Sequence, residues 1–143
     1  MPFDYRIDVA RRLVISRAWG VLTTPDLLGH AATLGKDPRF RPDMRQLVDF
    51  CDVTKLEITT DTVRQMVALN PFLAGSRRAL VFGSAGAYGM GRMYQLLSDA
   101  TPDVVELFRA LEPALEWLGL AKDDAEVLAA LETIRASARE LDG

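Results

Sequence analysis

The sequence predicts an α/β protein: a mixed five-stranded sheet with helices packed on it and an extra C-terminal helix. Two observations lead to this fold class. The chain opens with two adjacent β-rich segments, and short apolar runs then alternate with segments of helical spacing. Strands that alternate with helices need crossover connections, which join parallel strands, so an opening antiparallel hairpin makes the sheet mixed.

The opening hairpin is expected within the first twenty residues. Apolar and polar side chains alternate over residues 5–9, and residues 12–20 are rich in β-formers and end on a glycine. The junction at residues 10–11 is short enough for a tight turn. We therefore expect these two strands to pair antiparallel.

Helices and strands alternate after the hairpin. The first helix should have Thr24 as its N-cap and Pro25 at its first position, where a missing N–H donor costs nothing. The second helix should stop at Asn70, because Pro71 follows. The expected elements are a helix from 24, a strand at 45–50, a helix at 60–69, a strand at 78–82, a helix after the glycine-rich stretch 83–91, a strand at 103–108 and a helix at 110–118.

Residues 123–141 predict a separate amphipathic helix. Its apolar stripe consists of Val127, Leu131, Ile134, Ala138 and Leu141. The chain therefore divides into a domain at residues 1–121 and a helix at residues 122–143. A helix of this length is marginal alone in water, so it should pack on its own domain or at a homodimer interface, and both alternatives stay open.

Composition excludes several classes of function. A single cysteine, Cys51, rules out an internal disulfide and multi-cysteine metal sites, and a single histidine, His30, argues against a metal centre. No cofactor is therefore expected. The formal net charge of −3 argues against nucleic-acid binding. No signal-peptide pattern and no long apolar run occurs, which predicts a cytoplasmic protein without a membrane span.

A catalytic set is equally hard to assemble from these residues. Cys51 has no second histidine to partner it, and its position after an apolar strand predicts a small packing residue. His30 is expected at the boundary of the core on the first helix. Asp49 and Asp52 are too weak a pair to nominate for acid–base chemistry. The sequence therefore predicts a protein that is not an enzyme.

The stretch Gly83–Gly91 is the strongest local signal for a binding site. It follows a strand and precedes a helix, a context in which backbone N–H groups can receive an anion. Its glycine spacing fits neither the dinucleotide nor the phosphate-loop fingerprint, so a flexible loop capped onto a helix is one interpretation. The alternative is a site for a small apolar or anionic ligand, or for a protein partner. The candidate contacts are Gly86, Tyr88, Gly89 and Arg92.

Several blocks of the chain resemble the STAS/SpoIIAA-like proteins, in particular the small bacterial single-domain group with that fold. The resemblance spans residues 4–119. Its most specific pieces are Gly89-Met90-Gly91-Arg92-Met93-Tyr94 and the ending from Leu107-Phe108-Arg109 to Ala114-Leu115-Glu116-Trp117-Leu118. The resemblance implies a sheet with helices on its faces and a non-enzymatic interaction or regulatory role.

The best-studied branch of this family also implies a control point. There, a small STAS protein is an anti-sigma-factor antagonist that is phosphorylated at the start of the helix after the third strand, in an Asp-Ser-Ser-Gly run. The equivalent stretch here, residues 57–60, places Thr59 at the acceptor position. Glu57 and Asp61 would repel a phosphate there, and the alternative is that Thr59 or Thr60 serves only as a helix N-cap.

Overall fold

A computed structural model of the chain describes residues 2–73, 75–98 and 103–142, and the side chains of the last helix as far as Arg135. In chain order the elements are β1 (Phe3–Asp8), β2 (Leu13–Thr23), α1 (Thr24–Lys36), β3 (Arg45–Glu57), α2 (Thr60–Ala68), β4 (Arg77–Phe82), α3 (Ala85–Leu97), β5 (Val104–Phe108), α4 (Leu111–Trp117) and α5 (Ala125–Asp142). The sheet order is β1-β2-β3-β4-β5. Strand β1 runs antiparallel to β2, and the other neighbours are parallel, which confirms the mixed five-stranded sheet.

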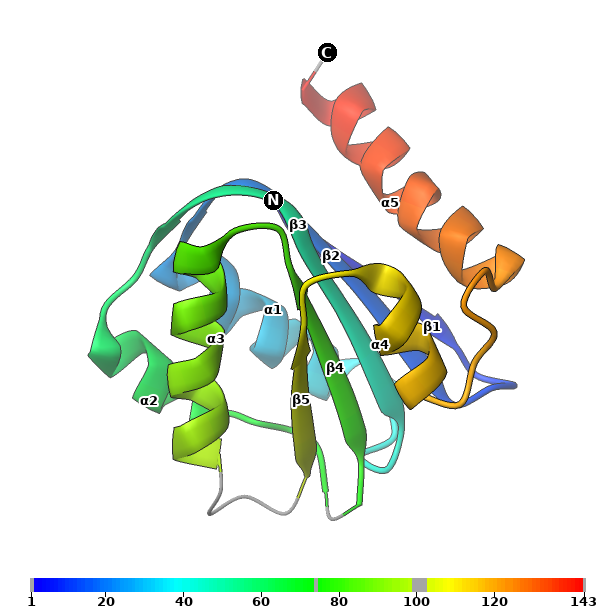
Figure 1. Cartoon of the computed structure of the whole chain (residues 1–143), viewed down its shortest axis with the longest axis horizontal. Helices are drawn as coiled ribbons and strands as arrows, with labels where there is room; N and C mark the ends of the chain where they lie inside the picture. The colour runs from blue at the N-terminus through cyan, green and yellow to red at the C-terminus, as the bar shows by residue number, and fades with distance from the viewer. Residues whose placement is uncertain (1, 74, 99–102, 143) are drawn as a thin grey trace.

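Different helices cover the two faces of the sheet (Figure 1). Successive strand side chains point to opposite faces, so each strand contributes to two apolar clusters. Helices α1, α2 and α3 cover one face, where Leu27, Val63 and Tyr94 pack against strand residues that include Val48 and Phe82. Helices α4 and α5 cover the other face. There the cluster consists of Leu13, Ile15, Leu47, Ala79, Val81, Ala114, Leu115, Leu118, Val127 and Leu131.

The first half of α5 packs on the sheet of its own chain. Val127 and Leu131 join the cluster around Leu13 and Ile15, and Ile134 is fully buried. Two further residues of the expected stripe, Ala138 and Leu141, have side chains outside the described residues. The stripe is therefore buried within the chain as far as Ile134.

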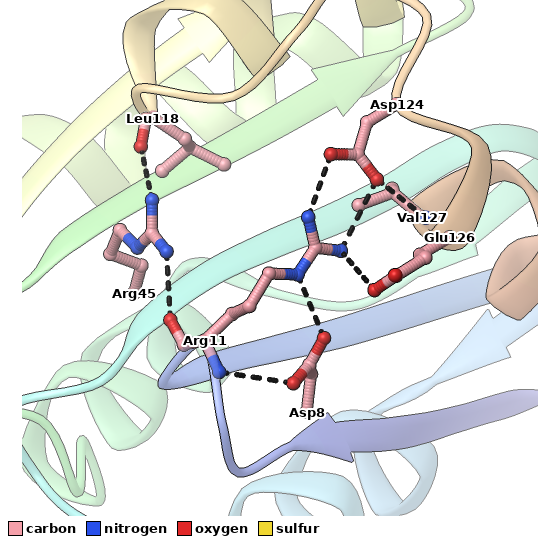
Figure 2. A network of polar contacts seen from close by, with 7 residues as sticks. All are labelled: Asp8, Arg11, Arg45, Leu118, Asp124, Glu126 and Val127. Carbon is pink, nitrogen blue, oxygen red and sulfur yellow. Dashed lines mark hydrogen bonds and ion pairs between the residues drawn. The ribbon is translucent and has the colours of Figure 1, made fainter.

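A polar cluster fixes the start of α5 against the first hairpin (Figure 2). Arg11, in the β1–β2 turn, donates to the carboxylates of Asp124 at 2.7 Å and Asp8 at 2.8 Å, and lies 3.4 Å from Glu126. Asp124 also accepts a hydrogen bond from the backbone N–H of Val127 at 3.0 Å, and so caps the helix it precedes. Arg11 therefore connects the first hairpin with the start of α5.

Several element boundaries differ from those expected, and two of the differences have a clear physical cause. Thr23, not Thr24, is the N-cap of α1, because the Asp26 carboxylate accepts from its backbone N–H at 2.9 Å in a capping-box arrangement. Strand β3 continues past residue 50 to Glu57, since its second half pairs with the end of β2, for example Leu56 with Leu22. This pairing lies between distant segments, and so the local pattern did not predict it.

Candidate functional site

A cavity lies between the sheet and the three helices α1, α2 and α3, and encloses about 80 Å³. Apolar side chains form most of its wall. Helix residues in the lining include Leu27, Ala31, Val63, Met66 and Met90, and strand residues include Phe3, Val48, Phe50, Leu80 and Phe82. One end of the cavity is polar, and it is formed by His30, Gln46, Asn70, Arg78 and Tyr94.

The polar end is built on the sheet face that the helices cover. Gln46 of β3 lies opposite Arg78 of β4 in the parallel register, and both side chains point toward α1 and α3. Arg78 Nε donates to Gln46 Oε1 at 2.9 Å, and Gln46 Nε2 donates to Ser16 Oγ at 3.1 Å. His30 Nε2 lies 3.2 Å from the same Ser16 oxygen. The hydrogen bonds thus cross three adjacent strands and reach helix α1.

Arg78 orients this chain of hydrogen bonds, because a guanidinium can only donate. Its contact requires Gln46 to turn the carbonyl oxygen toward it, so the Gln46 amide donates to Ser16. The same Ser16 oxygen lies within hydrogen-bond distance of Nε2 of His30, so the chain of hydrogen bonds continues to helix α1.

Arg78 is held by charge and by stacking. Its Nη1 donates to the Tyr94 hydroxyl at 2.7 Å and to Asp103 Oδ2 at 3.0 Å. The guanidinium also lies 4.5 Å from the centroid of the Phe72 ring. The side chain of Arg78 is 11% exposed and that of Asp103 is fully buried. Asn70 Nδ2 donates to the second Asp103 oxygen at 2.8 Å. The pair is therefore a buried, hydrogen-bonded ion pair.

His30 is more buried than the boundary position expected from the sequence. It is 8% exposed, and its ring stacks on Phe3 at a centroid distance of 3.8 Å. Burial, and then the positive charge of Arg78, lower the pKa of His30 to about 4. The imidazole is therefore neutral at neutral pH.

The glycine-rich stretch is helical, so the interpretation as a flexible loop was wrong. Helix α3 begins at Ala85, and the Ser84 hydroxyl caps it by accepting from Ala87 N at 3.2 Å. Gly91 is the position where glycine is required for close approach, because a Cβ there would overlap the Phe82 ring. Gly91 therefore lets the helix lie close to the sheet beside the cavity.

The four candidate contacts in this stretch lie outside the cavity. Gly86, Gly89 and Arg92 are exposed on α3, and Gly86 lines a separate surface hollow. Tyr88 is half-buried, with its ring edge-on to Phe82 at 6.1 Å. The same helix reaches the cavity instead through Met90, Gly91 and Tyr94.

We expect opposite effects from two alanine substitutions in this stretch. A Cβ at Gly83 would lie 2.6 Å from the backbone oxygen of Cys51, so Gly83→Ala should lower the free energy of unfolding by about 1–3 kcal/mol. Gly86 is a helical position with open space around it, so Gly86→Ala should raise this free energy by about 0.5–1 kcal/mol. Urea denaturation of both variants measures the difference, and equal effects would contradict it.

Thr59 is the N-cap of α2, where its hydroxyl accepts from Thr62 N at 3.2 Å. The residue is exposed, and phosphorylation there stays a prediction. Cys51, expected to be a packing residue, is instead exposed in the extended part of β3. Desolvation of the thiol, and then the Asp49 carboxylate, raise the pKa of Cys51 to about 12, so it is protonated and a poor nucleophile.

The described ranges hold neither a metal-binding cluster nor a membrane-spanning helix. No group of three or more His, Cys, Asp or Glu side chains there is placed to hold a metal ion. Among the described helices, none is long and apolar enough to cross a membrane. The cavity and its polar end thus remain the strongest candidate site.

The antiparallel β1–β2 pair, the parallel β2-β3-β4-β5 array and the helices on both faces define the SpoIIAA-like class of α/β folds. One solved structure is that of an uncharacterised protein from Shewanella loihica PV-4, which belongs to the DUF3478 family and has a SpoIIAA-like fold. It superposes on this chain with a TM-score of 0.55. The match covers 81% of this chain and 93% of that chain at 17% sequence identity. The sequence matches no protein-family model and no curated protein. The structural match confirms the SpoIIAA-like fold that the sequence predicted.

Proposed function

We propose that this protein is a non-enzymatic binding module that holds a small, mainly apolar molecule between its sheet and helices α1–α3. The observation that carries the proposal is the cavity itself, with an apolar wall and polar groups gathered at one end. Ligand sites in proteins have this composition, because apolar contact supplies affinity and a few polar groups set the orientation. The proposed site is the cavity on the sheet-facing side of α3, and not the exposed glycine-rich start of that helix. The proposed function is thus one of the alternatives expected from the sequence, a binding module for a small molecule, with its site in the cavity and not in the Gly83–Gly91 stretch.

The size of the cavity limits what it can enclose. Its volume of about 80 Å³ is smaller than the roughly 150 Å³ of an apolar cavity that takes up benzene. Met66 and Met90 form part of the wall, and methionine side chains are flexible enough to change the shape of the space. A compact ligand, or one compact end of a longer ligand, is therefore the expected occupant.

A cavity-filling substitution tests this function. Ala31 of α1 lines the cavity and is half-buried, whereas its neighbour Ala32 is exposed. Ala31→Leu should lower the affinity for xenon, an apolar probe smaller than benzene, at least tenfold, because the larger side chain takes the space that the probe occupies. Ala32→Leu is the matched control and should leave the affinity unchanged. Amide chemical shifts from NMR titration measure both.

Two results would contradict the proposed function. One is an unchanged xenon affinity in Ala31→Leu, with the thermal transition of the variant showing that it is folded. The other is the absence of shift changes at cavity residues such as Val48 and Val63 when xenon is added to the wild-type protein. Native mass spectrometry of the protein from its own host supplies an independent measurement, since a retained small molecule adds directly to the mass.

A further inference from the structure

The hydrogen-bond acceptors at the polar end of the cavity already have donors. Gln46 Oε1 accepts from Arg78, and the two Asp103 oxygens accept from Asn70 and Arg78. Asn70 Oδ1 accepts from the backbone N–H of Phe72 at 3.0 Å. A ligand that brought a donor to this end would therefore share an oxygen that already accepts from the protein.

Donors, in contrast, remain available there. The hydrogen bonds of Arg78 use Nε and Nη1, and Nη2 has no partner among the described residues and is not fully enclosed. The Tyr94 oxygen accepts from Arg78, so its own O–H is left to donate, and in the described ranges it finds no acceptor. Both side chains line the cavity. The polar end therefore offers N–H and O–H groups to whatever fills the space.

The formal charges of the side chains at the polar end of the cavity add up to zero. The Arg78 guanidinium faces the buried Asp103 carboxylate at 3.0 Å, and Tyr94 and Asn70 are uncharged at neutral pH. Burial keeps the imidazole of His30 in its neutral form. A carboxylate entering this end would add an unbalanced negative charge to a largely apolar cavity, and such a charge is costly to remove from water. An uncharged acceptor meets no such cost.

We propose that the ligand is an uncharged molecule that presents a carbonyl oxygen, as in a ketone, ester or amide, to Arg78 and Tyr94. Its apolar part lies against the wall formed by residues such as Val63, Met66 and Phe82. This assignment rests on the proposed function and adds the chemical class of the ligand. It excludes fatty-acid anions and purely hydrocarbon molecules as the preferred occupants.

Three probes of equal size and nearly equal shape test the assignment: 2-pentanone, 2-methyl-1-pentene and butanoate. Each joins a propyl group to a trigonal carbon. The probes differ in what that carbon carries beside the propyl group: a carbonyl oxygen and a methyl group, a methylene group and a methyl group, or the two oxygens of a carboxylate. At neutral pH, the ketone should bind at least tenfold more tightly than the alkene, the lower limit expected for a hydrogen bond from a charged donor such as Arg78. Butanoate should bind at least tenfold more weakly than the ketone. NMR titration of the wild-type protein gives all three affinities.

Tyr94→Phe serves as the matched variant. It removes the spare O–H donor and keeps the ring, so the advantage of the ketone over the alkene should shrink several-fold while the alkene binds as it does to the wild type. Equal binding of ketone and alkene to the wild-type protein, or tighter binding of butanoate, would overturn the assignment of ligand class and leave the proposed function standing. Absence of binding by every probe and by xenon would overturn the proposed function itself. The wild-type comparison decides the question even if Tyr94→Phe does not fold.

Discussion

Replacing Arg78 by methionine is expected to lower the free energy of unfolding by about 3–5 kcal/mol, because it leaves the Asp103 carboxylate buried without its cation. The same change removes the donor to Gln46 Oε1 and the group stacked on Phe72. Methionine fills a similar volume, so the loss comes chiefly from the uncompensated charge. Chemical denaturation at neutral pH measures the effect.

The matched control is Arg6→Met. Arg6 also pairs with an aspartate, Asp4, at 3.1 Å, but the two side chains are 39% and 45% exposed. Exposed pairs contribute about 0–1 kcal/mol, so this variant should be close to wild type. Combining Arg78→Met with Asp103→Asn should cost less than the sum of the two single changes, because the double variant buries no unpaired charge. Equal effects of Arg78→Met and Arg6→Met would show that the buried pair does not stabilise the fold.

The protein is expected to lose about 2 kcal/mol of stability between pH 7 and pH 5, through His30 alone. The pKa of His30 is about 4 in the folded chain against 6.5 for a free side chain. Between these values the unfolded chain binds a proton that the folded chain does not, so stability is complete above the window and falls as the pH drops through it. Urea denaturation at intervals of pH measures the change.

This expectation has a simple control, because His30 is the one histidine of the sequence. His30→Gln cannot titrate, so its stability should stay nearly constant over the same pH range, although the stack on Phe3 is lost. Aspartates and glutamates titrate mainly below this window. A His30→Gln variant that loses as much stability as the wild type between pH 7 and pH 5 would assign the effect to other groups.

Local patterns predicted the elements of the fold well where the determining interactions are local. The cap and proline at the start of α1 were placed within one residue, and the helix expected at 110–118 is α4, which ends just before Gly119 in the left-handed conformation. The sequence pattern gave a wrong prediction at the glycine-rich stretch, where a loop was expected and most of the residues are helical. Residues 83–91 combine many glycines with a single capping serine, and the packing of Gly91 on Phe82 decides in favour of a helix.

The cavity left a weaker signal in the sequence. Gln46 and Arg78 are polar residues that point to the helix-covered face of the sheet, next to the apolar runs of β3 and β4, and this placement could have marked the site. Gln46 and Arg78 form the polar end of the cavity only together with His30 and Tyr94, which lie on α1 and α3. The sequence drew attention instead to Gly86, Tyr88, Gly89 and Arg92, because clustered glycines are visible in one segment and a cavity between segments is not.

The sequence by itself determined the order of strands and helices, the mixed sheet and the lack of a Cys/His metal or disulfide framework. These follow from periodicity, turn residues and composition, which act over a few neighbouring positions. Only the tertiary structure decided that the stripe of α5 is buried within the chain as far as Ile134, that β3 extends to Glu57 and that Arg78 meets Asp103 beside a cavity. The physical reason is that burial, ion pairing and cavity shape arise from contacts between segments far apart in the chain.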